Sequence, residues 1–267
     1  DDIVIFSPTM PEHTQHVAHT LALLTKHGLR IKLPKCHFAQ TTVKLLGHIV
    51  SSTHPAGLRP DPEKLLAMEQ FPKPTTPLQI QRFMGMLQYY SRHFPRLSII
   101  AAPFHAERSK SSFTWTSVHD DAFQAIRTEL IQKPVTLAFP DFSRPLHLIT
   151  DASVVGFGCI LAQPASDDAP DSPRHIIACY SRTTSPAEKN YSPTLLELAA
   201  LYWSLLKTEQ YTLGRHFTVW TDHRALTFMH SQRHLNSMLS RWFLILLRFN
   251  FTVNHKPGAQ NVVADAL

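Results

Sequence analysis

The sequence predicts an α/β fold whose C-terminal half is a mixed five-stranded sheet with covering helices. Residues 147–163 hold two apolar runs around a turn of small residues, which is typical of a β-hairpin. Apolar residues recur at helical spacing over 194–208, which predicts an amphipathic helix. The other elements of this half are expected as strands at 175–180, 217–221 and 251–255 and a helix at about 239–248. Because helices connect the later strands, the sheet is expected to combine both strand directions.

The first fifty residues predict a helix between short strands. Val17, Leu21 and Leu24 lie three and four residues apart and Gly28 supplies a C-terminal cap, so a helix is expected from Pro11 to Gly28. Strands are expected around it at 1–7, at 29–33, where apolar and polar residues alternate, and in a hairpin containing 35–38 and 45–50.

A helical region is expected to follow from residue 59. One helix begins near Pro62 and is broken by the proline-rich stretch 71–77, a second runs from Leu78 to Tyr90, and a third covers 120–133. Gly85 lies inside the second helix, where glycine costs about 1 kcal/mol relative to alanine. It therefore indicates a close approach, either by another helix or by the minor groove of a duplex. On the second interpretation Arg82, Gln88 and Arg92 reach phosphates or groove edges.

Composition narrows the class of protein. The 267 residues can bury one large core or two ordinary ones, and 43% of them are hydrophobic. No apolar run approaches the roughly 18 residues of a membrane span, and no signal-peptide pattern is present, so no membrane partner and no secretion are expected. The three cysteines lack C-x-x-C spacing and indicate reduced thiols. Residues 1–140 carry 15 Lys and Arg against 10 Asp and Glu, which weakly favours a polyanionic partner.

Four acidic side chains lie next to or within apolar elements. Asp151 ends the first strand of the hairpin, Glu197 lies early in an amphipathic helix, Asp222 ends a later strand and Asp265 lies near the C-terminus. A turn-capping role is the alternative for Asp151 taken alone. A carboxylate in an apolar strand is costly unless it is paired or holds a metal. Oxygen ligands suit Mg²⁺ or Mn²⁺, so four converging acids predict a site for two divalent ions.

The acids belong to four motifs with a fixed order. These are Thr150-Asp151-Ala152-Ser153, Tyr191-Ser192 with Glu197, Thr221-Asp222-His223, and Pro257-Gly258 with Asn261 to Leu267. Together they resemble the ribonuclease H (RNase H) domain of gypsy-type (Metaviridae) LTR-retrotransposon reverse transcriptases. Upstream, Asp1-Asp2 resembles the end of the polymerase acidic hairpin, and 35–38 with 45–50 the hairpin that holds the primer end. Residues 78–90 resemble the thumb, and Trp115-Thr116 with Ala122-Phe123 the connection.

The resemblance implies three domains and an RNase H-like fold for the last of them. Residues 1–58 would be a palm remnant, 59–135 the thumb and connection, and 136–267 an RNase H-like domain truncated at its C-terminus. The chain is therefore expected to be a fragment of a retroelement polyprotein. Its implied activity is Mg²⁺-dependent hydrolysis of RNA in RNA–DNA hybrids. The parent polyprotein would also polymerise DNA, but this chain alone would not.

The resemblance also assigns roles to individual residues. Asp151, Glu197, Asp222 and Asp265 would hold two Mg²⁺ ions, with Mn²⁺ as a possible substitute, and Asp1 and Asp2 would support polymerase metals. His255 would help the product leave, or it simply ends a strand. The expected contacts with the duplex are Ser153, Gly156, Ser181, Arg182, Asn190 and Tyr191 in the nuclease and Arg82, Gly85, Gln88 and Arg92 in the thumb.

A protein of another class is the alternative. The chain would then be a non-catalytic nucleic-acid-binding remnant or a domesticated retroelement protein that keeps the fold for binding. In either case we expect a cytoplasmic retroelement particle or the nucleus as its location. Duplex nucleic acid is the expected partner, and dimerisation with another reverse-transcriptase subunit is possible.

Overall fold

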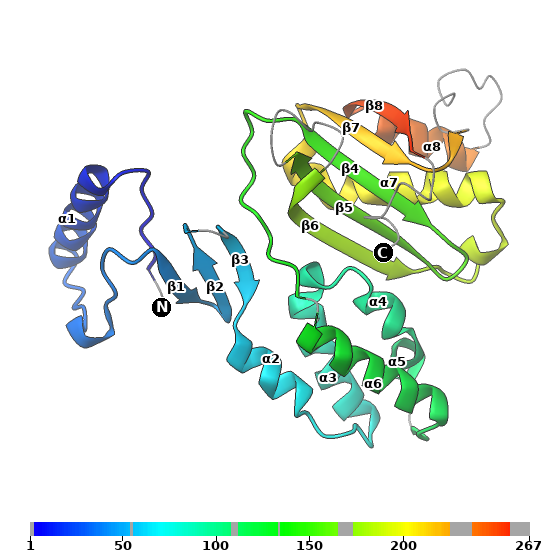
Figure 1. Ribbon diagram of the computed structural model, residues 1–267, viewed down its shortest axis with the longest axis horizontal. Helices are drawn as coiled ribbons and strands as arrows, with labels where there is room; N and C mark the ends of the chain where they lie inside the picture. The colour runs from blue at the N-terminus through cyan, green and yellow to red at the C-terminus, as the bar shows by residue number, and fades with distance from the viewer. Residues whose placement is uncertain are drawn as a thin grey trace.

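The structure, a computed structural model, describes residues 3–53, 56–107, 112–132, 134–164, 173–224 and 237–256. Its helices are α1 Met10–Lys26, α2 Pro62–Glu69, α3 Pro77–Tyr90, α4 Leu97–Ile100, α5 Ala102–Glu107, α6 Ser117–Gln132, α7 Pro193–Thr212 and α8 Ser237–Leu246, with 3-10 turns η1 Leu33–Lys35, η2 Ser91–His93 and η3 Glu188–Asn190. Its strands are β1 Thr42–Leu45, β2 His48–Ser51, β3 Gly57–Pro60, β4 Leu146–Ala152, β5 Gly156–Pro164, β6 Pro173–Thr183, β7 His216–Thr221 and β8 Asn250–His255. Figure 1 shows the small sheet and helices α2–α6 beside a larger sheet with α7 and α8.

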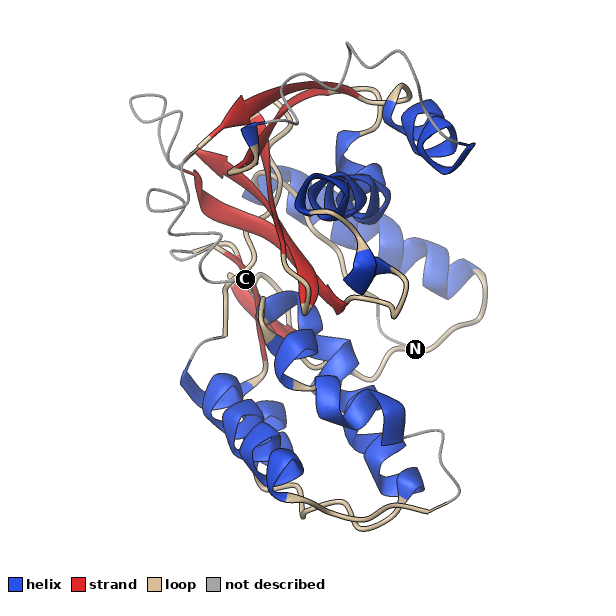
Figure 2. Ribbon diagram, turned by 90° about the vertical axis from the view of Figure 1, so that its right-hand side faces the viewer, coloured by secondary structure: helices blue, strands red, loops and turns tan. Residues whose placement is uncertain are grey.

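The larger sheet confirms the predicted mixed five-stranded α/β fold. Its strand order is β6-β5-β4-β7-β8, with antiparallel pairing among β4, β5 and β6 and parallel pairing of β4 with β7 and of β7 with β8. Helices α7 and α8 lie on one side of the strands (Figure 2). The main core forms between them and the sheet, where Leu148, Leu161, Leu201, Leu205 and Val219 are fully buried.

The helical region has a separate core. Four phenylalanines from four segments, Phe83, Phe94, Phe104 and Phe123, are fully buried there, and the ring centroids of Phe83 and Phe123 lie 5.3 Å apart. Thr76 caps α3, with its side chain accepting from the backbone N–H of Gln79, as expected where proline occupies the first turn. No helix in the described ranges has the length and apolar character needed to cross a bilayer.

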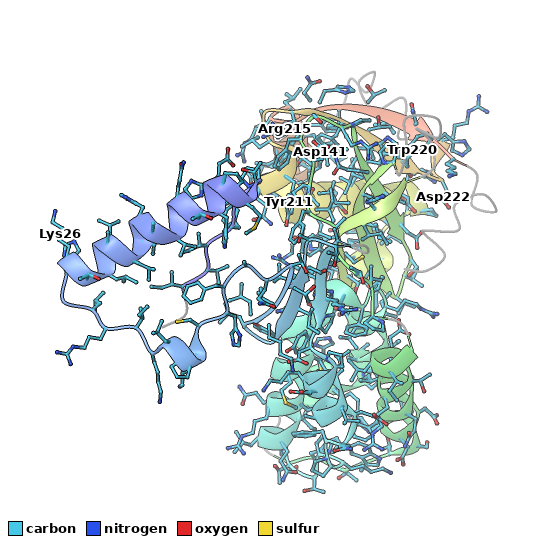
Figure 3. All side chains as sticks on the ribbon, turned by 60° about the vertical axis from the view of Figure 1, so that its left-hand side comes forward. Lys26, Asp141, Tyr211, Arg215, Trp220 and Asp222 are labelled. Atoms are coloured by element: carbon cyan, nitrogen blue, oxygen red, sulfur yellow. The ribbon has the colours of Figure 1, made fainter. Side chains whose placement is uncertain are left out.

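The N-terminal strands were predicted wrongly. Residues 3–7 and 29–32 form no strand, and a 3-10 turn occupies Leu33–Lys35. Leu29 and Leu33 are 60% and 65% exposed, so alternation alone did not produce a half-buried strand. A strand also needs a neighbour for its backbone groups, and none pairs with these residues in the part of the chain that the structure describes. Helix α1 projects from the rest, with Lys26 at its far end (Figure 3), and none of its residues is buried.

The predicted hairpin forms, although it lies later in the chain than expected. Strands β1 and β2 are antiparallel and their turn is Leu46-Gly47, while 35–38 lies outside it. Strand β3, which was not predicted, adds to β2. Leu46 and Gly47 both have positive φ, 46° and 73°, as a type I′ hairpin turn requires.

Contacts between the helical region and the larger sheet join the two halves. A Cβ placed on Gly156 would lie 3.1 Å from Cγ1 of Ile99 and 2.7 Å from the backbone oxygen of Arg182. The Arg92 guanidinium lies over the Tyr180 ring, 5.4 Å from its centroid. The backbone N–H of Ala138 donates to Ile176 O at 2.6 Å. Gly156 is therefore required for close packing between the halves.

Candidate metal centre

Parallel pairing of two strands places two of the predicted acids side by side. The register of β4 and β7 pairs Ile149 with Trp220. Asp151 and Asp222 each follow two residues later, so both lie at the same end of neighbouring strands. Figure 3 shows Trp220 and Asp222 at this end of the sheet.

Helix α7 brings the third acid to the same place. Its N-terminus is capped by Ser192, whose hydroxyl accepts from the backbone N–H of Leu195 at 3.4 Å. The helix then packs across β4 and β5, burying Leu198, Leu201 and Leu205 against the sheet. Glu197 lies on the second turn of this helix. The packing of these leucines on the sheet therefore also fixes the position of Glu197.

The three carboxylates converge. One oxygen from each of Asp151, Glu197 and Asp222 lies within 4.8 Å of the others. Glu197 is only 7% exposed, whereas Asp222 is exposed and Asp151 is half-buried. Burial, and then the nearby charges of Asp222 and Asp151, raise the pKa of Glu197 to about 8, although a backbone hydrogen bond from Ala152 opposes the shift.

The donors present at this site fit a divalent cation. The Oε2 atom of Glu197 is buried and has no hydrogen-bond partner in the described structure, which is costly for a polar atom. A cation bound among the carboxylates would satisfy this atom and offset the repulsion among the three charges. All the donors are carboxylate oxygens, which suit Mg²⁺ or Mn²⁺. The convergence that was predicted from sequence is thus observed for three of the four acids.

Binding of Mg²⁺ is expected to depend steeply on pH because of Glu197. The cation requires the ionised carboxylate, and the metal-free pKa is about 8. Apparent affinity should therefore tighten roughly tenfold per pH unit between about pH 6 and about pH 8 and then level off. Calorimetric titration of the chain with Mg²⁺ across this range measures the slope. An affinity that does not change with pH would contradict the assignment of Glu197 as a ligand.

Two histidines lie beside the acids. Strand β8 pairs His255 with Thr221, and the His255 Nε2–H donates to the backbone oxygen of Asp222 at 2.9 Å. His223 Nε2 is hydrogen-bonded to Thr194 Oγ1 at 2.9 Å. His255 therefore both ends a strand and lies next to the candidate centre. Both interpretations of this residue are compatible with that position. Thr194 was not singled out from the sequence, and its contact spans 29 residues with no local pattern to indicate it.

Several predicted duplex contacts have structural partners within the chain. The Ser153 hydroxyl accepts from the N–H groups of Val155 and Gly156, each at 3.2 Å, and so shapes the β4–β5 turn. The Arg182 guanidinium binds both carboxylate oxygens of Glu188 at 2.6 and 2.7 Å and lies over the Phe157 ring. The structure gives Ser153, Gly156 and Arg182 roles in turn formation and packing, and their duplex contacts remain predictions.

Other predicted contacts lie near the start of α7 or in β6. Asn190 is exposed, and its side-chain amide donates to Pro186 O at 3.3 Å. The Tyr191 hydroxyl contacts Sδ of Met238 at 3.6 Å. Ser181 is half-buried and pairs with Gly158. Asn190 and Tyr191 come just before Ser192, the N-cap of the helix that carries Glu197.

The Arg182–Glu188 pair is expected to stabilise the half of the chain that contains the larger sheet. The arginine and hydrogen bonds from Ser185 lower the pKa of Glu188 to about 2, so this stabilisation is present above about pH 4.5 and is lost as the pH falls through 2. At neutral pH, Glu188→Gln should lower the free energy of unfolding by about 2 kcal/mol, because Arg182 keeps a half-buried charge without its partner. Urea unfolding of both proteins measures this difference. Equal stability at neutral pH would show that the pair is not stabilising.

The exposed face of α3 contains three of the predicted thumb contacts. Arg82, Gly85 and Gln88 are exposed, and Arg92 is exposed just beyond the helix. A Cβ on Gly85 would meet nothing within 4 Å, so close helix packing within the described chain does not explain this glycine. Contact of this glycine with a duplex remains a prediction. Asp1, Asp2 and Asp265 lie outside the described residues, so their predicted roles remain predictions.

The fold and these acids indicate an RNase H-like domain attached to part of a reverse transcriptase. Residues 141–249 match the family of the RNase H-like domain found in reverse transcriptase, and residues 1–50 match the reverse transcriptase (RNA-dependent DNA polymerase) family. The "Retrovirus-related Pol polyprotein from transposon opus" of Drosophila melanogaster is 35% identical over 280 residues, covering 100% of this chain and 27% of the relative. For the corresponding polyprotein of transposon gypsy, also from Drosophila melanogaster, identity is 32% over 281 residues, with 100% and 26% covered. The chain thus belongs to the gypsy-type LTR-retrotransposon reverse transcriptases and spans about a quarter of these relatives.

Solved structures support the fold over nearly the whole chain. The foamy viral protease-reverse transcriptase in complex with RNA/DNA hybrid matches with a TM-score of 0.76 and 20% identity, covering 96% of this chain and 35% of that one. A second structure of the foamy viral enzyme, called dRH and in complex with double-stranded DNA, matches with a TM-score of 0.78 and 19% identity over 94% of this chain and 44% of that one.

Proposed function

We propose that this chain hydrolyses the RNA strand of RNA–DNA hybrids in a reaction that depends on Mg²⁺. The observation that supports this most strongly is the convergence of Asp151, Glu197 and Asp222 within 4.8 Å, with an unpartnered, buried Glu197 oxygen among them. Related foamy viral structures contain double-stranded DNA or an RNA/DNA hybrid, so a nucleic-acid duplex is the partner we propose here. The family membership and the acids together favour a nuclease over a binding protein.

The acids would act as ligands of two Mg²⁺ ions. Asp151, Glu197 and Asp222 would hold them, and we propose Asp265 as a fourth ligand. The ions would supply an activated water and charge stabilisation at the leaving 3′ oxygen. Glu197 must first lose its proton, since its metal-free pKa is about 8. The hydrogen bond from His255 to the carbonyl of Asp222 fixes the end of β7 and holds an imidazole beside the acids, where it would help the product leave.

Recognition of the hybrid would rely on sugar and phosphate rather than base edges. Base edges in the deep, narrow major groove of an A-like duplex are poorly accessible to side chains, whereas the wide minor groove exposes the 2′-hydroxyls. Asn190, which is exposed, and Tyr191, which is half-buried, precede Glu197 and offer neutral donors and acceptors suited to such contacts. The exposed face of α3 would bind the same duplex further from the acids. A basic chain, with net charge +6, favours this polyanionic partner.

Replacing one arginine on α3 should weaken hybrid binding without touching the acids. In Arg82→Ala, loss of one phosphate contact should lower the slope of log affinity against log salt by roughly 0.9. Fluorescence anisotropy across a salt series measures the slope. Lys26→Ala is the matched control, because Lys26 lies at the far end of the projecting α1 (Figure 3) and its replacement should leave the slope unchanged. If the salt slope of Arg82→Ala equals that of wild type, α3 does not contact phosphates.

Substrate selectivity tests the proposed reaction. With Mg²⁺, the chain should cut the RNA strand of a hybrid and leave single-stranded RNA and duplex DNA intact. If it binds the hybrid tightly yet cuts no RNA at any Mg²⁺ concentration, the non-catalytic alternative is correct. A location in cytoplasmic particles or the nucleus, and pairing with a second reverse-transcriptase subunit, are further parts of the proposal.

A further inference from the structure

One short segment at the end of α3 contacts the hairpin and the nuclease sheet together. Residues 89–93, which we call the joint, include the last two residues of α3 and the turn η2. The side chains at its start bind the hairpin turn, and those at its end bind the nuclease half. The joint therefore connects α3 to two surfaces that lie far apart in the sequence, the hairpin turn and the nuclease half.

Two tyrosines hold the turn between β1 and β2. The Tyr89 hydroxyl donates to Leu46 O at 2.5 Å, and the Tyr90 hydroxyl donates to Gly47 O at 2.9 Å. Leu46 has a φ of 46°, a region that a leucine rarely adopts, so contacts from outside the turn help to maintain it. At Gly47, a Cβ would lie 2.6 Å from the Tyr90 hydroxyl, which leaves no room for a side chain.

The other end of the joint contacts β6 of the nuclease half and the segment that leads toward β4. Arg92 lies over the ring of Tyr180 in β6, 5.4 Å from its centroid. His93 is 2% exposed, its Nδ1–H donates to Val135 O at 2.8 Å, and its backbone oxygen accepts from Val135 N at 2.8 Å. The segment after Val135 leads directly into β4, the strand that carries Asp151.

The hairpin turn extends the exposed face of α3. Tyr89 is 54% exposed and Leu46 is 68% exposed, and both lie at the end of the helix face that begins with Arg82 and Gly85. A duplex lying along this face would meet the hairpin turn at its end. The two tyrosine hydroxyls thus link the hairpin turn to the end of this helix face.

We propose that Tyr89 and Tyr90 are positioning residues that join the hairpin turn to α3, so that a bound hybrid meets the metal centre at one set distance along its length. Arg92 and His93 transmit this position to the nuclease sheet. The inference rests on the proposed function, since it assumes that α3 binds the hybrid that the acids cut. Its specific content is that the tyrosine hydroxyls determine where the RNA is cut, not whether it is cut.

The variant Tyr89→Phe with Tyr90→Phe isolates this role. Both carbonyls keep another donor, because Leu46 O also accepts from His48 Nδ1–H at 3.1 Å and Gly47 O from Asp61 N–H at 3.0 Å. No buried acceptor is left unsatisfied, so the fold should persist. Each lost hydrogen bond should raise about fivefold the fraction of molecules in which the hairpin turn is detached from α3.

The test maps cleavage sites and binding on one end-labelled hybrid. Wild type and the control Tyr202→Phe, on α7, should cut the RNA in the same narrow group of positions. The double variant should cut at a similar total rate at saturating hybrid, over about twice as many positions, with a shorter hydroxyl-radical footprint measured without Mg²⁺. Gly47→Ala should show the same spread, because its Cβ displaces Tyr90.

Two outcomes separate this inference from the proposed function. A double variant with the wild-type cleavage positions and the wild-type footprint would overturn the inference while leaving the nuclease intact. If wild type cuts no RNA, the proposed function fails, and the footprint alone tests the role of the two tyrosines. Protection of equal length in wild type and double variant would then overturn the inference.

Discussion

Asp151→Asn is expected to reduce cleavage of the RNA strand by more than about a hundredfold while the protein stays folded. Asp151 contributes one of the three converging carboxylates, and loss even of a residue that only supports a metal ligand costs 10- to 100-fold. Asparagine has almost the same volume and keeps an oxygen, but it lacks the charge that holds Mg²⁺. Single-turnover cleavage of a labelled hybrid measures the loss.

Thermal unfolding of the same variant provides the control. Without metal, removal of one of three crowded negative charges relieves repulsion, so the melting temperature should hold or rise. Hybrid binding in the absence of Mg²⁺ should be unchanged. Cleavage at a rate near that of wild type would show that Asp151 is not a metal ligand.

Glu197→Gln is expected to stabilise the metal-free protein at high pH and to abolish cleavage. The pKa of Glu197 is about 8 in the folded protein and its ordinary value is 4.5, so the folded protein keeps this proton to a higher pH than the unfolded chain does. The stability associated with this proton is fully present below about pH 4.5 and is lost as the pH rises through 8. Above that pH, the buried carboxylate is charged in wild type but the glutamine is neutral. The variant should then be more stable by an amount on the order of 4 kcal/mol.

Urea unfolding with EDTA at about pH 4 and about pH 9 tests this expectation. The two proteins should have nearly equal stability at the lower pH and differ at the higher one. Asp222→Asn is the matched comparison, because Asp222 is exposed and its change should have a much smaller effect on stability. If Glu197→Gln has the same pH dependence as wild type, Glu197 is not the buried acid that the structure indicates.

The nuclease half was largely predictable from sequence because its signals are local. Apolar runs predicted β4, β5, β7 and β8, and Asp151 and Asp222 directly follow or end such runs. Parallel pairing of β4 with β7 then brings those two acids together. The structure confirms the mixed sheet and the convergence of three acids.

The features that were missed depend on contacts between distant residues. Alternation at 29–33 predicted a strand, but pairing requires a neighbour that pattern alone does not supply. The pairing of Arg182 with Glu188 was not predicted, because no local pattern indicates it. The Tyr89 contact with Leu46 spans 43 residues, and neither residue carries a pattern that indicates it.

Cleavage of a hybrid by the purified chain across a Mg²⁺ titration tests the central claim most directly. We predict RNA cleavage that is absent in EDTA, rises with Mg²⁺, yields products with 3′-hydroxyl ends and disappears in Asp151→Asn. Cleavage that persists in EDTA, or a hybrid that stays bound and uncut at every Mg²⁺ concentration, would contradict a metal-dependent nuclease built on Asp151, Glu197 and Asp222.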